Sequence, residues 1–145
     1  MNDYLNVIRN NYANFSGRAR RREYWMFQLI NTVIMLVLYV PVAGFLLPSL
    51  LASQRTGETL PGISPLVAVF LLLYVVYTLA VIVPSLAVTV RRLHDAGYSG
   101  WLFLIAFVPF VGSIALLVLT ILESKPGSNK WGPNPKGVNA PITAF

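Results

Sequence analysis

Three long stretches without a charged side chain dominate this sequence and restrict the folds open to it. They run over residues 25–47, 66–90 and 101–122. A bilayer core takes about 20 apolar residues of helix, and each stretch meets that length. Because backbone polar groups in hydrocarbon must be bonded internally, each stretch is expected to be helical. The sequence therefore predicts an all-α integral membrane protein with three hydrophobic transmembrane helices.

The composition supports this class. Of the 145 residues, 56% are hydrophobic and 11% are charged, against about 25% charged residues in soluble domains. A chain of this length cannot hide so much apolar surface from water. The chain has no cysteine and one histidine, so we expect no disulfide, no metal site and no cofactor.

Each apolar stretch contains one proline, namely Pro41, Pro84 and Pro109. Proline removes a helical hydrogen bond and bends the helix, and such kinks are tolerated in membrane helices. The alternative is a hinge around a site. Pro109 is followed by Gly112 and Ser113 at mid-depth. The third segment is therefore expected either to span the membrane with a kink or to turn back as a re-entrant segment.

Both ends of the chain differ from the apolar stretches. At the N-terminal end, apolar residues recur at steps of three or four: Leu5, Ile8, Tyr12 and Phe15. This spacing predicts a short amphipathic helix that lies on the membrane surface or packs on the protein's own spans. The polar segment 48–65 is expected to be a loop. We expect one membrane domain, residues 1–136, with a Gly/Pro/Asn-rich tail over residues 123–145.

Positive charge sets the predicted orientation. A dense block precedes the first apolar stretch: Arg18, Arg20, Arg21 and Arg22. The N-terminus is therefore predicted to be cytoplasmic, and Arg91 and Arg92 return to the same face after two crossings. With a third full crossing the C-terminal tail is predicted to lie outside, although its three lysines mildly oppose this. A third segment that turns back removes this conflict.

The segment RRLHDAGYSGW, residues 91–101, concentrates charge between the second and third stretches. If the second helix continues for one more turn, Asp95 lies four residues after Arg91 and three after Arg92. Such pairs touch across a helix turn. The segment is therefore interpreted as a tight turn between two spans with an internal ion pair.

The rest of this segment admits two interpretations. Gly97 supplies a helix end and Ser99 is placed to cap the next helix, which makes the segment a plain turn. The alternative is a polar site, because the pKa of His94 ordinarily lies near neutrality and Asp95 is its neighbour. No catalytic constellation is recognised. An enzyme acting through His94 and Asp95 is therefore the least favoured hypothesis.

The arginines are candidates for binding an anion. The tripeptide FSG before the block and YSG before the third stretch share one face and could pack side by side. A shared ligand would then be surrounded by six residues: Arg18, Arg20, Arg21, Arg22, Arg91 and Arg92. Guanidinium groups hold phosphate in bidentate fashion, which favours lipid headgroups or phosphorylated partners. Glu23, beside the block, is expected to pair with Arg20.

Three motifs together resemble those of a known family, the small bacterial inner-membrane proteins of domain of unknown function 805. They are FSGRARRREYW over residues 15–25, RRLHDAGYSGW over 91–101 and NKWGPNP over 129–135. The resemblance implies a multi-pass protein of the bacterial inner membrane and supplies no activity or catalytic residue. It also suggests that the three motifs meet on one face, which requires the tail to reach the cytoplasmic side.

These observations favour a non-enzymatic membrane component whose arginine-rich cytoplasmic face binds anionic lipid headgroups or a partner protein. The net charge of +6 is assigned to the membrane and not to nucleic acid. The alternative is one subunit of an oligomeric small channel or transporter, because three helices can hardly enclose a pore. The absence of charge within the spans lowers that alternative.

Overall fold

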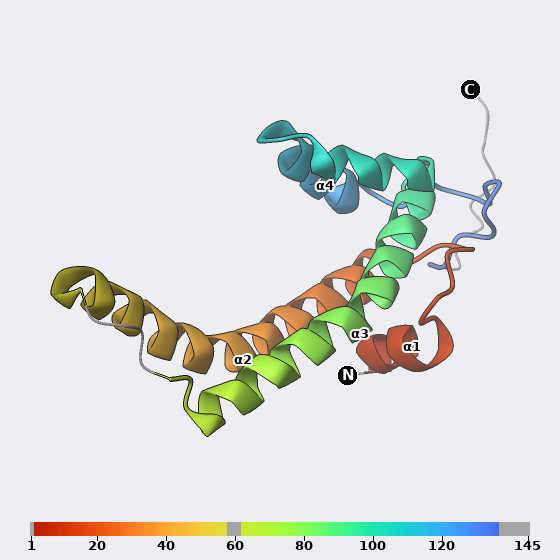
Figure 1. The fold of residues 1–145 in the computed structure, drawn as a ribbon. Coiled ribbons are helices and arrows are strands. Elements are labelled where there is room, and N and C mark those ends of the chain that lie inside the picture. The colour runs from red at the N-terminus through yellow and green to blue at the C-terminus, as the bar shows by residue number, and fades with distance from the viewer. Residues whose placement is uncertain (1, 58–61, 137–145) are drawn as a thin grey trace. The chain divides into compact units, whose positions relative to one another are not determined.

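A computed structural model describes residues 2–57 and 62–136 (Figure 1). The helices are α1 (Asn2–Asn10), α2 (Arg21–Thr56), α3 (Pro65–Asp95), the 3-10 helix η1 (Gly100–Phe107) and α4 (Val111–Ile121). Among the described residues the only extended pairing is an isolated bridge between Asn129 and Gly132. The predicted all-α class is confirmed.

The chain divides into two compact units. We call residues 1–28 and 83–145 the terminal unit, and residues 29–82 the central unit. The long helices α2 and α3 contribute to both. The terminal unit also contains α1, η1, α4 and the described part of the tail.

Within the described residues, two helices, α2 and α3, are long and apolar enough to cross a membrane. Only 6% of the most apolar window of α2 is buried, and 11% of that of α3. A helix in the core of a soluble protein would be mostly buried, so these helices need an apolar environment from outside the chain. In the central unit, the Tyr77 hydroxyl of α3 donates a hydrogen bond to Asn31 Oδ1 of α2.

Helix α2 is longer than the sequence predicted. The segment 48–65 was expected to be a loop, but the helix continues through Pro48 to Thr56. The residues after Pro48 include Leu, Ala, Gln and Arg, which have high helix propensity. Gly57, with φ of +70°, donates its N–H to the Ser53 carbonyl at 2.9 Å and ends the helix.

The stretch 101–122 does not form one continuous helix. It divides into η1 and α4, which pack against each other as a hairpin (Figure 1). The reversal is a γ-turn at Phe110, with φ of +62°, in which the Val111 N–H donates to the Pro109 carbonyl at 2.7 Å. A Cβ on Gly112 would lie 1.9 Å from the Ile105 carbonyl oxygen, so only glycine permits this close approach. The predicted alternative of a segment that turns back is the one observed.

Helix α1 is shorter than the predicted amphipathic segment and uses a different face. Val7 is fully buried, and the Tyr4 ring stacks on Phe27 of α2 with centroids 5.5 Å apart. Tyr12 and Phe15, which were predicted to share the apolar face, follow the helix and are exposed. The residues after Asn10 are rich in asparagine, which favours turns over helix.

Candidate functional site

The most concentrated polar structure lies at the end of α3, around the fully buried carboxylate of Asp95. Helix α3 runs past the apolar stretch for one more turn, as predicted. It ends in a Schellman motif in which Gly97, with φ of +89°, donates to His94 O at 3.0 Å and Tyr98 donates to Leu93 O at 2.9 Å. The predicted helix end at Gly97 is confirmed.

Two arginines and a serine share the carboxylate of Asp95. Arg92, three residues earlier on the helix, donates from Nη1 to Oδ2. Arg18 donates from Nε to Oδ1 at 2.9 Å, across 77 residues of sequence. Ser124 of the tail donates its hydroxyl to Oδ2. The predicted Arg92–Asp95 pair is confirmed, and the contacts of Arg18 and Ser124 were not predicted.

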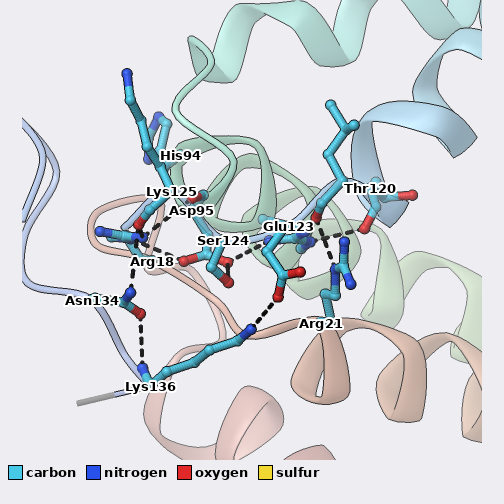
Figure 2. A network of polar contacts seen from close by, with 12 residues as sticks. Arg18, Arg21, His94, Asp95, Thr120, Glu123, Ser124, Lys125, Asn134 and Lys136 are labelled. Atoms are coloured by element: carbon cyan, nitrogen blue, oxygen red, sulfur yellow. Dashed lines mark hydrogen bonds and ion pairs between the residues drawn. The ribbon is translucent and has the colours of Figure 1, made fainter. Parts of the chain in front are cut away.

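The same arginines donate to backbone carbonyls of the end of α4 and of the tail, as Figure 2 shows in part. Arg18 donates to Lys125 O at 2.7 Å and to Gly127 O at 2.8 Å. Arg92 donates to Thr120 O at 2.9 Å and to Leu122 O. We call Asp95, Arg18, Arg92, Ser124 and these carbonyls the Asp95 network.

The Asp95 network satisfies charges that are costly to bury. The side chains of Arg18, Arg92 and Asp95 are each at most 1% exposed. Removing one partner of a buried ion pair leaves an uncompensated charge, which costs about 3–5 kcal/mol. Because tail carbonyls accept hydrogen bonds from Arg18 and Ser124 of the tail donates to Asp95, folding of the tail and burial of these charges depend on each other.

Arg91 does not join this network. Its Nη1 donates to Glu23 Oε1 at 2.8 Å, and its side chain is buried. Its Nε and Nη2 have no partner within the described part of the chain. The prediction that Glu23 pairs with Arg20 is therefore wrong, as is the predicted contact of Arg91 with Asp95. Spacing along one helix suggested both pairs, whereas the real partner comes from another helix.

The remaining arginines of the block point in different directions. Arg21 donates from Nε to Leu122 O at 2.8 Å. Arg22, whose side chain is 81% exposed, pairs with Asp3 of α1 at 3.0 Å, and Arg20 is exposed. The six predicted arginines thus do not converge on one ligand site in this structure: Arg18, Arg91 and Arg92 are buried, Arg21 is bonded to Leu122 O, and Arg20 and Arg22 are exposed at the surface.

His94 serves as a docking surface for the tail. Its ring stacks on Trp131 with centroids 4.4 Å apart and planes 12° apart, and its backbone carbonyl accepts a hydrogen bond from Asn129 Nδ2 at 2.9 Å. Its Nδ1 lies 3.3 Å from Gly17 O. Burial lowers the pKa of His94, which lies beyond the uncharged stretch 66–90, and nearby Lys130 lowers this pKa further, while the Gly17 carbonyl opposes the shift. The neutral ring is therefore the favoured form at pH 7.

His94 and Asp95 do not form a joint site. The side chain of His94 faces Trp131 and Gly17, whereas that of Asp95 faces the two arginines. Ser99 occupies the N-cap position of η1, but its hydroxyl makes no capping hydrogen bond. Within residues 2–57 and 62–136, no group of three or more His, Cys, Asp or Glu side chains could hold a metal ion.

The three motifs meet in the terminal unit. Residues 17–19 contact the end of α3 at three points. Arg18 donates to Asp95, the Gly17 carbonyl lies beside His94 Nδ1, and Ala19 N donates to Arg91 O at 3.0 Å. The tail joins them as Lys125 N donates to Asp95 O at 2.9 Å. The expectation that three full crossings place the tail away from the arginine block does not hold, because the third stretch folds back.

Comparison with known proteins gives the family. The family described as "Protein of unknown function (DUF805)" matches residues 12–133. Inner membrane protein YhaI of Escherichia coli (strain K12) is 42% identical over 133 residues, 92% of this chain and 94% of that protein. Inner membrane protein YhaH of the same strain is 40% identical over 136 residues, 94% of this chain and 98% of that protein. No solved structure matches the chain.

The matched range includes the arginine block, the whole RRLHDAGYSGW turn and Trp131 of the tail. The relatives are inner membrane proteins by name, and the exposed apolar helices α2 and α3 agree with that location. The chain therefore belongs to the DUF805 family of proteins of unknown function.

Proposed function

We propose that this chain is a multi-pass inner-membrane protein whose terminal unit forms a basic cytoplasmic face that binds anionic lipid headgroups. In this arrangement α2 and α3 cross the bilayer. The η1–α4 hairpin enters and leaves from the cytoplasmic side, so that α1, the arginine block and the described part of the tail all lie in the cytoplasm. The role is that of a non-enzymatic membrane component.

The distribution of basic residues between the two units supports this proposal most directly. Ten of the eleven Lys and Arg residues belong to the terminal unit: Arg9, Arg18, Arg20, Arg21, Arg22, Arg91, Arg92, Lys125, Lys130 and Lys136. The central unit contains only Arg55. Basic residues are enriched on the cytoplasmic side of membrane proteins and are attracted to anionic lipids there.

The geometry of the η1–α4 hairpin supports partial insertion. Helix α4 has 11 residues, which at about 1.5 Å per residue reach about half of a hydrocarbon core of about 30 Å. Its tip is apolar and open, with Phe107 78% and Phe110 93% exposed. The N–H groups of Val108, Val111 and Gly112 are bonded within the hairpin, as burial in lipid requires.

Headgroup binding is assigned to Arg20 and Arg22, because Arg18 and Arg92 donate to the Asp95 network and Arg91 is buried against Glu23. Arg20 and Arg22 are exposed just before the apolar part of α2. A basic residue near an anionic surface contributes about 1 kcal/mol of binding free energy. Losing both is therefore expected to weaken binding by about tenfold or more.

The test titrates fluorescent phosphatidylglycerol into the purified protein in a mild detergent, at low and at high salt. The double variant Arg20→Gln/Arg22→Gln should raise the apparent Kd by about tenfold or more at low salt. Arg55→Gln removes a charge from the central unit and should leave the Kd unchanged. Equal binding by the double variant and the unchanged protein would overturn the lipid proposal. It would favour a partner protein as the ligand of the exposed arginines.

A further inference from the structure

A cleft lies beside His94, and no side chain of the Asp95 network lines it. It has a volume of about 410 Å³ and is lined by parts of α3, η1, the tail and the segment after α1. Most of its lining is apolar or aromatic: Phe15, Leu86, Val90, Trp101, Phe103 and Trp131. Volume and lining match the usual sites of small-molecule ligands, which are mostly apolar with a few placed polar groups.

The cleft follows the end of the apolar stretch of α3. Leu86 and Val90, near the end of that stretch, line the cleft. Trp101 of η1 also lines the cleft and is 76% exposed. Exposed tryptophans are common where a membrane protein meets the headgroup region. Given the proposed membrane placement, acyl chains reach this opening directly.

The floor of the cleft depends on the absence of a side chain at Gly100. A Cβ there would lie 2.7 Å from Val90 Cγ1 and 3.0 Å from His94 Nε2. Both distances are shorter than comfortable contacts, so any larger residue would push into the space between η1 and α3. Gly100 thus lets η1 lie close against α3 beside the cleft.

The polar end of the cleft carries a positive charge and one acceptor. Lys130 Nζ lies 4.3 Å from the centroid of the Trp131 ring, and the cleft is lined by no Asp or Glu from the described part of the chain. Because Nδ1 of neutral His94 faces the Gly17 carbonyl, it carries the proton and Nε2 is left as an acceptor. The cleft therefore offers a cation and an acceptor next to apolar walls.

We propose that this cleft binds one anionic phospholipid whose headgroup carries a hydroxyl. An acyl chain packs along Leu86, Val90 and Phe103, Lys130 pairs with the phosphate, and His94 Nε2 accepts a hydrogen bond from the headgroup hydroxyl. This inference rests on the proposed membrane placement, but it does not use the exposed arginines. It assigns a single, slowly exchanging lipid to a defined site, in contrast to the diffuse attraction of Arg20 and Arg22.

The experiment measures retained lipid by native mass spectrometry after equal additions of phosphatidylglycerol, phosphatidylcholine or palmitate to the purified full chain in a mild detergent. The unchanged protein should retain one phosphatidylglycerol in preference to the other two. Lys130→Gln should reduce that retention about fivefold, the equivalent of about 1 kcal/mol for one basic residue. Lys125→Gln, another tail lysine that does not line the cleft, should have no effect.

Two further variants separate the possible results. Gly100→Ala should also reduce retention, and because Lys130 is an exposed side chain, Lys130→Gln keeps the test valid if Gly100→Ala fails to fold. Arg20→Gln/Arg22→Gln should still retain the single phosphatidylglycerol, which distinguishes the cleft from the surface. Equal retention of phosphatidylcholine, preferential retention of palmitate, or full retention by Lys130→Gln would each overturn the proposal.

Discussion

The terminal and central units are built from the same two long helices but are held together differently. In the terminal unit, charged side chains bond to each other and to backbone carbonyls across as many as 109 residues of sequence. In the central unit, large apolar side chains such as Leu66, Leu72 and Val37 are more than half exposed, and α2 and α3 are joined by neutral polar contacts such as that of Tyr77 with Asn31. The first unit is fixed by its own chemistry, whereas the second depends on its surroundings.

The two units are therefore expected to differ in how much stability a substitution removes. A unit held by buried charges loses stability when one partner is removed. A unit whose apolar surface faces lipid tolerates changes on that surface, because lipid replaces lost contacts. Substitutions in the two units, and in buried and exposed ion pairs, should therefore differ in their effect on stability.

Replacing Asp95 should have the largest effect. Asp95→Asn leaves Arg18 and Arg92 buried without a counter-charge, and we expect a loss of about 3–5 kcal/mol in the free energy of unfolding. Thermal unfolding in detergent and proteolysis of the tail would measure it. Glu123→Gln is the matched control, because the exposed Lys136–Glu123 pair, which lowers the pKa of Glu123 through its hydrogen bond, should matter little for stability. An Asp95→Asn protein with unchanged unfolding would contradict a stabilising Asp95 network.

Two glycines compare the units directly. Gly112→Ala would place a Cβ against the Ile105 carbonyl in the η1–α4 hairpin, and we expect a loss of about 1–3 kcal/mol or more. Gly44→Ala in α2 of the central unit meets no atom within 4 Å and should stabilise the helix slightly. Thermal unfolding of both variants checks this ordering. Equal destabilisation by the two substitutions would show that the hairpin is not packed as described.

The smallest expected effect is the pH dependence of tail docking. The pKa of His94 is lowered in the folded protein, so the unfolded chain binds more protons just below the ordinary histidine value of about 6.5. Stability should therefore be complete above that value and fall as the pH drops toward the lower folded-state pKa. Hydrogen exchange of residues 125–132 between pH 7.5 and 5.5 measures it, with His94→Gln as control. An unchanged dependence in His94→Gln would exclude this origin.

Local sequence rules predicted part of this molecule. Apolar length identified α2 and α3, and helical spacing identified the Arg92–Asp95 pair and the helix end at Gly97. The ion pair and the helix end depend on residues within about one turn of each other, and the apolar lengths depend on one continuous segment each. The combination of Pro109 and Gly112 also indicated where the third stretch could reverse.

The long-range contacts had no comparable signal. Nothing in the sequence distinguishes Arg18, which reaches Asp95, from Arg20, which stays exposed. Arginines that bind carbonyls, such as Arg92 with Thr120 O, leave no pattern at the accepting position because every residue carries a carbonyl. Trp131 belongs to the NKWGPNP motif, but its stacking on His94 follows only from the fold-back of the third stretch.

In the proposed topology, the tail and the arginine block lie on one side of the membrane, joined by the Asp95 network. Because the chain has no cysteine, single cysteines at the exposed positions Ala13, Gln54 and Ser128 can be labelled with a membrane-impermeant maleimide. We predict that Gln54→Cys is labelled in intact spheroplasts, and that Ala13→Cys and Ser128→Cys are labelled only after permeabilisation. Labelling of Ser128→Cys together with Gln54→Cys, with Ala13→Cys protected, would contradict the account.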